Sequence, residues 1–89
     1  MTSEQLKEYI DESEEPFLQP NGFEDCLVGL VQGFGGHETL AYDQDKIIQK
    51  LQADGMSLEE AIEYFDYNII GAYVGPKTPV YITIPKNEN

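Results

Sequence analysis

The stretch CLVGLVQGFGGHETLAY, residues 26–42, decides how the chain begins to fold. Cys26–Gln32 is a short apolar run, Gly33–Gly36 is rich in glycine, and Glu38–Tyr42 is a second strand-like run. Two such runs separated by turn residues are typical of a β-hairpin. With Gly33–Gly36 as the loop, we expect Gln32 to pair with His37 and Cys26 to pair with Asp43.

Two helices are expected directly after the hairpin. Asp43 is placed to cap the first helix, which ends at Asp54 with Gly55 beyond it, and its apolar face consists of Ile47, Ile48 and Leu51. Ser57 and Glu60 form a capping-box pattern that starts the second helix, over 57–70. Spacings of four, three and four predict that its core-facing stripe consists of Leu58, Ile62, Phe65 and Ile69.

Two short strands, over 72–74 and 80–84, are expected after the second helix. Val80, Ile82 and Ile84 alternate with Tyr81 and Thr83, which predicts that the aliphatic set faces the core. The order of elements predicts the α+β class: a small antiparallel sheet, made of the hairpin plus two C-terminal strands, packed on one face against two helices.

The N-terminal part of the chain carries most of the negative charge. The first 25 residues hold eight carboxylates against Lys7 alone. We expect residues 1–22 to form an acidic arm, 23–85 a single α+β domain and 86–89 a tail. Thr2 or Ser3 could cap a short helix through Tyr9. The arm either packs through apolar residues or stays partly mobile, and the residues available for packing are Leu6, Ile10, Phe17 and Leu18.

The overall charge excludes several kinds of partner. Seventeen Asp and Glu residues oppose five lysines, for a formal net charge of −12. Nucleic-acid binders need a basic face, so direct binding of nucleic acid is not expected, and an anionic membrane would repel the chain. No apolar run approaches the roughly 20 residues that span a bilayer, and the first residues lack a secretory signal. We therefore expect a cytoplasmic protein that does not bind membranes.

Cys26 and His37 are the one pair that could supply a nucleophile and its base. In the expected hairpin they lie about five strand residues, or roughly 16 Å, apart. A single Cys and a single His cannot form a Cys/His zinc site. An EF-hand pattern from Asp43 fails because Ile47 and Ile48 occupy a ligand and the glycine position. We expect no enzymatic activity, no metal and no cofactor.

Carboxylates and tyrosines together are the strongest candidates for binding a partner. Tyrosine gives a large contact area at small entropic cost, and aromatic groups within an acidic surface suit a basic protein. The alternative is that the carboxylates form a solvated surface while the tyrosines complete the core. The candidate residues are Glu59, Glu60, Glu63, Tyr64, Asp66 and Tyr67 on the second helix, and Glu12, Glu14 and Glu15 on the arm.

The stretch GMSLEEAIEYFDYNIIGAYVG, residues 55–75, followed by Thr78 and Pro79, resembles a family of small proteins from tailed bacteriophages and prophages. Tyr42, Asp43, Lys46 and Leu51 also fit the family pattern, so the resemblance covers roughly residues 26–84 and leaves out the arm. It implies a phage accessory protein in the cytosol of the host cell, and it implies no activity.

Two classes of function follow from these observations. In the first, the protein is non-catalytic and binds a host or phage protein, and a sharper form is an acidic inhibitor that imitates DNA and occupies the basic cleft of a nucleic-acid enzyme. That form predicts carboxylates along one face. In the second, the protein is a small structural or assembly component that forms a homo-oligomer through a sheet edge, with contacts such as Tyr81 or Val80.

Overall fold

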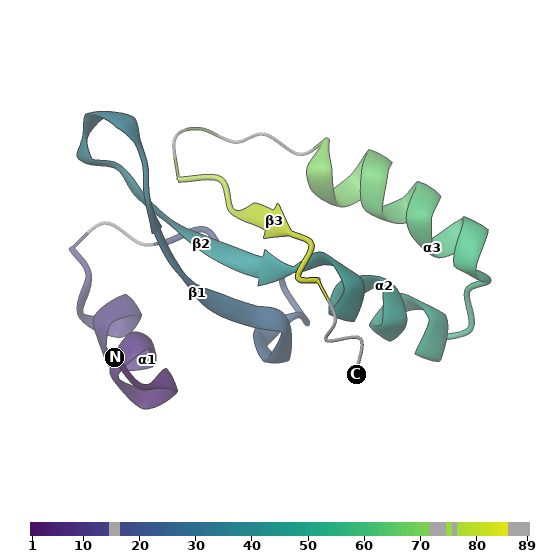
Figure 1. Cartoon of the computed structure of the whole chain (residues 1–89), viewed down its shortest axis with the longest axis horizontal. Coiled ribbons are helices and arrows are strands. Elements are labelled where there is room, and N and C mark those ends of the chain that lie inside the picture. Colours follow the sequence, from purple (N-terminus) through teal and green to yellow (C-terminus); the bar gives the residue numbers. More distant parts are fainter. Residues whose placement is uncertain (15–16, 72–74, 76, 86–89) are drawn as a thin grey trace.

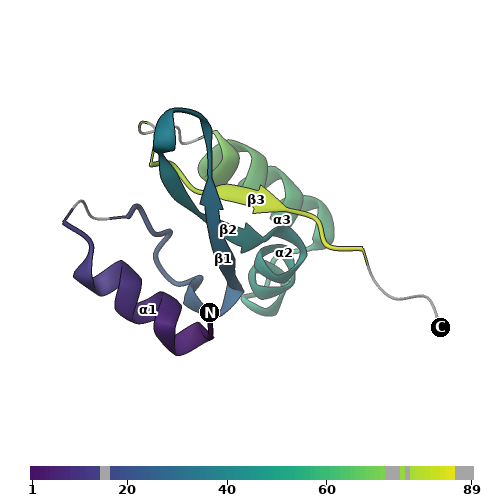
Figure 2. The same cartoon turned by 60° about the vertical axis from the view of Figure 1, so that its left-hand side comes forward.

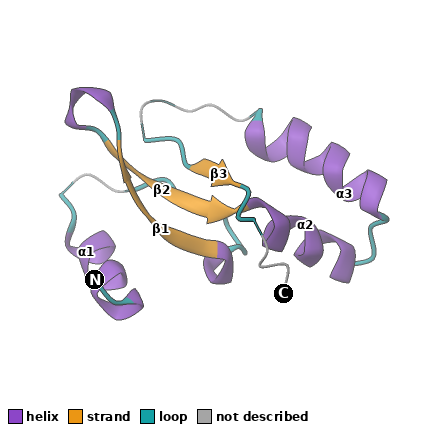
Figure 3. Cartoon of the chain, viewed as in Figure 1, coloured by secondary structure: helices purple, strands orange, loops and turns teal. Residues whose placement is uncertain are grey.

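In the part of the chain that the structure describes, a three-stranded sheet is combined with three α-helices (Figures 1 and 3). The fold is known from a computed structural model, which describes residues 1–14, 17–71, 75 and 77–85. The strands are β1 (Leu27–Gln32), β2 (Glu38–Asp43) and β3 (Val80–Ile82), in the order β1-β2-β3. The α-helices are α1 (Ser3–Glu12), α2 (Gln44–Ala53) and α3 (Leu58–Tyr64). The α+β class expected from the sequence is confirmed.

The hairpin is present, with a register that differs from the expected one at its closed end. Gln32 pairs with Glu38, not with His37. The reason is the loop, which includes a 3₁₀ turn over Phe34–Gly36 and leaves His37 beyond the last pair. A register shift between Leu27 and Gly29 then places Leu27 opposite Tyr42. A pairing of Cys26 with Asp43, as expected from the sequence, would also place Leu27 opposite Tyr42, so the observed register agrees with the expected one at the open end of the hairpin.

The sheet is mixed, which corrects the expectation of an antiparallel sheet. β3 lies parallel to β2, with Ala41 opposite Val80 and Asp43 opposite Ile82. Two helices separate these strands in the chain, so the connection can return to the starting end of the sheet and enter it in the same direction as β2. The strand expected over 72–74 lies outside the described residues.

The expected helix starts are confirmed by their capping contacts. The Asp43 carboxylate accepts a hydrogen bond from the backbone N–H of Lys46 at 3.2 Å. At the start of α3, the Ser57 hydroxyl accepts from the Glu60 N–H at 3.1 Å, and the Glu60 carboxylate accepts from the Ser57 N–H at 3.2 Å. The helix then continues as a π-helical segment over Phe65–Ile70, with Gly71 as its C-cap.

The core-facing side of α3 differs from the predicted stripe. Phe65 and Ile69 are buried as expected, whereas Leu58 and Ile62 are 53% and 41% exposed. Ala61, which is fully buried, takes their place. Residues 61, 65 and 69 lie four apart on one line of the helix, and the small side chain of Ala61 lets the helix backbone approach the rest of the core closely.

The acidic arm contains α1 and contributes to the same core. Leu6, Ile10 and Phe17 are buried and belong to the hydrophobic cluster that includes the sheet and helix residues. Leu18, by contrast, is 36% exposed. The helix extends to Glu12, beyond the expected end at Tyr9, and Thr2 and Gln5 form its capping box.

The sheet lies between α1 and the pair α2–α3 (Figures 1 and 2). Four successive residues of β2, from Thr39 to Tyr42, are buried. Since successive side chains of a strand point to opposite faces, both faces of β2 are covered. This overturns the expected helix cover on one face only, because the arm supplies the second layer.

On β3 the predicted alternation is not found, because Tyr81 and Ile82 are both partly buried while Val80, Thr83 and Ile84 are exposed. Tyr81 packs against the core, with its ring 5.3 Å from Phe65 in an edge-to-face arrangement and 6.2 Å from Tyr42. Val80 and Ile84 are 37% and 42% exposed, and Ile82 is partly buried. An aromatic ring that fills the space beside Phe65 and Tyr42 buries more apolar area than an aliphatic side chain would.

Candidate protein-binding surface on the third helix

A shallow groove of about 330 Å³ follows α3 and the π-helical segment after it. Four of the residues that the sequence singled out line it: Glu60, Glu63, Tyr64 and Tyr67. Met56 and Asn68 complete its lining. We call this set of six residues the α3 groove. It brings two carboxylates and two phenol rings together on one exposed part of the molecule.

The helix geometry explains why these side chains meet. Residues three and four apart are neighbours on a helix surface, so Glu60 lies beside Glu63 and Tyr64, and Tyr64 lies beside Tyr67. Tyr64 is 41% exposed and Tyr67 is 82% exposed, whereas Phe65, between them in sequence, is buried. Phe65 therefore anchors the helix while the two tyrosines point away from the core.

The carboxylates of the groove differ in their partners. Glu60 is held by its capping hydrogen bond with Ser57. For Glu63, no hydrogen bond or ion pair with another described residue is present. The one salt bridge among the described residues joins Lys50 on α2 to Asp25 in the turn before β1, at 2.6 Å. The negative charge of α3 is therefore not neutralised by a neighbouring lysine in the described part of the chain.

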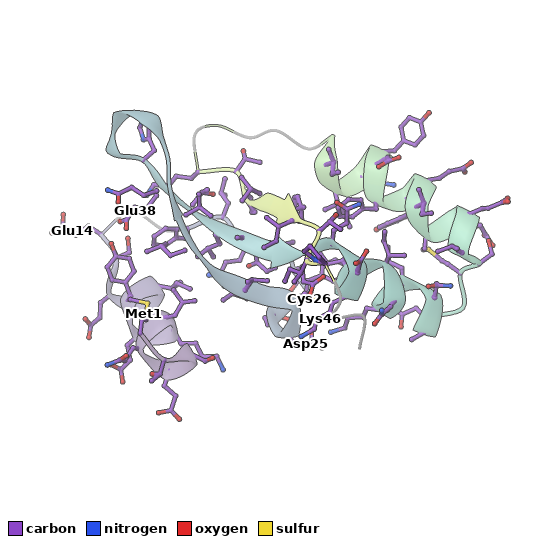
Figure 4. The ribbon with its side chains drawn as sticks, in the orientation of Figure 1. Met1, Glu14, Asp25, Cys26, Glu38 and Lys46 are labelled. Carbon is purple, nitrogen blue, oxygen red and sulfur yellow. The ribbon has the colours of Figure 1, made fainter. Side chains whose placement is uncertain are left out.

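The remaining predicted residues are divided between two sides of the molecule. Glu59 and Asp66 are exposed on the same helical stretch but do not line the groove. Glu12 and Glu14 belong to the arm, and Glu14 lies on the α1 side of the sheet, far from α3 (Figure 4). Glu15 lies outside the described residues. The structure thus brings together part of the predicted set and separates the arm from it.

Met56 and Asn68 were not among the predicted partner-binding residues. Neither of them carries a charge or an aromatic ring that would single it out. Met56 reaches the groove because it directly precedes the capped start of α3. Asn68 reaches it because it lies four residues after Tyr64, on the same side of the helical stretch. Helical spacing is the signal that points to both residues, because Met56, Glu60, Tyr64 and Asn68 follow one another at intervals of four.

Cys26 and His37 lie at opposite ends of the hairpin. The Cys26 side chain is buried, and its thiol donates a hydrogen bond to Asp25 at 3.7 Å. Burial raises the pKa of the Cys26 thiol, and the neighbouring Asp25 carboxylate raises it further. Asp25, Cys26 and Lys46 gather where β1 meets α2 (Figure 4). A thiol with a raised pKa is a poor nucleophile at neutral pH.

No family model, curated protein or solved structure matches the chain. Within residues 1–14, 17–71, 75 and 77–85, no three His, Cys, Asp or Glu side chains are grouped so that they could hold a metal ion. None of the helices in that part of the chain combines the length and the apolar character needed to cross a membrane.

Proposed function

We propose that this protein is a non-catalytic accessory protein that binds another protein with a basic surface through the α3 groove. The observation that carries the proposal is the pairing of two exposed tyrosines, Tyr64 and Tyr67, with the carboxylates of Glu60 and Glu63 along one groove. Interfaces are enriched in aromatic anchors, and such anchors carry a large share of the binding energy.

The chemistry of the groove favours lysine and arginine side chains on the partner. A cation can lie over a phenol ring and pair with a neighbouring carboxylate at the same time. The net charge of −12 draws a basic partner from a distance and raises the rate of encounter. Glu63, which has no described partner of its own, is available for such a contact.

From the resemblance of residues 26–84 to phage and prophage proteins, we further propose that this function is exercised in an infected bacterium. A phage accessory protein of this kind would act on a host or phage protein in the host cytosol. Imitation of DNA is the sharper form of the same function. The separation of the arm from α3 by the sheet favours a local, tyrosine-centred contact over one continuous row of carboxylates that includes both (Figure 2).

A capture experiment from bacterial lysate tests the proposal. Tagged wild-type protein is compared with the double variant Glu60→Gln/Glu63→Gln and with a charge-matched control, Glu8→Gln/Glu12→Gln on α1. We expect one defined basic protein to be retained by the wild type and the control, and lost with the groove variant. Washing at high salt should weaken its retention, since exposed charges are screened. Equal retention by all three proteins would contradict the proposal.

A second candidate function, a homo-oligomeric structural component, is favoured by one observation. β1 is an edge strand with no charged residue, and Val28 on it is 46% exposed. Edge strands without charge or proline invite pairing with another strand. Light scattering across a range of concentrations would detect a stable oligomer, and Val28→Lys should dissociate it. Tyr81 belongs to the core instead, so it is not available for such a contact.

A further inference from the structure

A second cavity, separate from the α3 groove, lies between α1 and the sheet. Its volume is about 300 Å³. Residues from α1, from the segment that follows it and from the β1–β2 hairpin line the cavity. The inner wall consists of the buried Ile10 and Tyr42 and the partly buried Leu27, whereas exposed polar side chains surround the opening. We call it the α1 pocket. Pockets of this size can hold a small organic molecule.

Tyr42 gives the α1 pocket a polar group at its inner wall. This residue is 1% exposed, and its hydroxyl has no hydrogen-bond partner among the described residues. Among those residues, no polar side-chain atom that is sealed from solvent lacks a partner. The Tyr42 hydroxyl therefore keeps a small contact with solvent, and Tyr42 lines the pocket. A hydroxyl with so little access to water gains a hydrogen bond when a ligand brings an acceptor to it.

The protonation state of Tyr42 decides whether its hydroxyl can donate a hydrogen bond to a ligand. Burial raises the pKa of Tyr42 to about 12, with smaller contributions from Tyr81, Glu24 and Cys26. The phenol therefore stays protonated at neutral pH and donates a hydrogen bond. A ligand that reaches the inner wall needs a hydrogen-bond acceptor there, and an apolar body to lie against Ile10 and Leu27.

The charged residues at the opening of the pocket favour a positively charged ligand. Asp11 and Glu24 line it with two carboxylates, against one ammonium group from Lys7. Lys7 is exposed and can extend its charge into water. The net charge of −12 repels anions and raises the local concentration of cations. An ammonium group on the ligand would therefore lie at the opening.

We infer that the α1 pocket binds a small organic amine: an apolar or aromatic body with an ammonium group at one end and a hydrogen-bond acceptor at the other. The acceptor pairs with the Tyr42 hydroxyl, the body contacts Ile10 and Leu27, and the ammonium group lies between Asp11 and Glu24. This site is on the opposite side of the sheet from the α3 groove, so it does not depend on the function proposed for that groove.

Three probes that differ by one group each test the inference on the full chain. Tyramine has both the ammonium group and the hydroxyl, phenethylamine lacks the hydroxyl, and 4-hydroxyphenylacetate replaces the ammonium group with a carboxylate. Backbone amide shifts are followed by NMR during titration. We expect saturable shifts at Ile10, Leu27 and Tyr42 with tyramine, binding about tenfold weaker with phenethylamine, and no binding with 4-hydroxyphenylacetate.

Two substitutions locate the contacts. Tyr42→Phe should reduce the affinity for tyramine to that for phenethylamine, and Glu24→Gln should weaken both amines, whereas the control Glu59→Gln on α3 should change neither. If Tyr42→Phe fails to fold, the comparison of tyramine with phenethylamine on the wild type still tests the hydrogen bond with the Tyr42 hydroxyl. Equal affinity for these two probes, binding of the anionic probe, or the absence of saturable shifts would overturn the inference. Shifts confined to Tyr64 and Tyr67 would overturn it too, because the amine would then lie in the α3 groove.

Discussion

At the scale of single residues, the tyrosines divide into two groups with different surroundings. Tyr42 and Tyr81 lie in the core with their rings close together, and burial raises the pKa of both. Tyr64 and Tyr67 lie on the surface of the third helix. The sequence alone left both roles open for each of them, because tyrosine suits a small core and an interface equally well. Burial, which depends on residues far away in the chain, separates the two groups.

The raised pKa of Tyr42 predicts a loss of stability at alkaline pH. A tyrosine in the unfolded chain ionises near its ordinary value of 10.0, whereas Tyr42 in the folded protein ionises at about 12. Between these values the unfolded state binds fewer protons, so the free energy of unfolding falls as pH rises. The stabilisation is fully present below the lower value, and its complete loss is on the order of 3 kcal/mol.

Urea unfolding at pH values from about 9 to 12 measures this effect. Tyr42→Phe removes the ionisable group while keeping the ring, so its stability should decline less steeply with pH than that of the wild type. Tyr67→Phe, at an exposed position, should follow the wild-type curve. A decline of the same steepness in Tyr42→Phe and the wild type would show that Tyr42 is not the group responsible.

At the scale of elements, the helix starts could be predicted from the sequence and the side of α3 that faces the core could not. The caps of Asp43 and Ser57 depend on contacts within three residues, so the local sequence contains all that they need. Two rows of side chains lie next to each other on this helix: one contains Leu58 and Ile62, and the other contains Ala61. Periodicity permits both, and packing against the rest of the core selects the row that contains Ala61.

Substitutions in the two rows should have unequal costs. Ala61→Leu places a large side chain at a fully buried position, and we expect it to lower the free energy of unfolding by about 1–3 kcal/mol. Leu58→Ala and Ile62→Ala, at exposed positions, should each cost less than about 1 kcal/mol. Chemical denaturation measures all three variants. If either substitution at Leu58 or Ile62 lowered the free energy of unfolding more than Ala61→Leu does, these residues would face the core, as the sequence pattern predicts.

At the scale of the whole molecule, contacts between distant segments explain the features that sequence patterns missed. The parallel pairing of β3 with β2 joins Ala41 to Val80 across two helices. The second layer on the sheet comes from the arm, where Tyr9 donates a hydrogen bond to Glu38 and the Lys77 ammonium lies 4.6 Å from the centre of the Phe17 ring. The sequence alone indicates that Phe17 could pack, but it does not indicate the partners of the arm, because Glu38 and Lys77 lie far along the chain from it.

Phe17 should hold the arm against the sheet. Its ring is 6% exposed, and the ring of Tyr9 lies 6.1 Å away. Loss of a buried phenylalanine ring costs about 3–5 kcal/mol, so Phe17→Ala should strongly accelerate amide hydrogen exchange in α1 while β2 keeps more of its protection. Leu18→Ala, at a half-exposed neighbour, should leave exchange in α1 nearly unchanged. Equal acceleration in α1 and β2 would mean that the arm unfolds together with the sheet and not separately.

Photo-crosslinking from the α3 groove tests the proposed function most directly. A photoreactive phenylalanine analogue replaces Tyr67, which is 82% exposed, and in a control chain it replaces the exposed Glu8 on α1. Irradiation in bacterial lysate should join position 67, and not position 8, to one defined protein with a basic surface, and Glu63→Gln in the same chain should reduce the yield. A protein joined only at position 8, or equally at both positions, would contradict partner binding through the α3 groove.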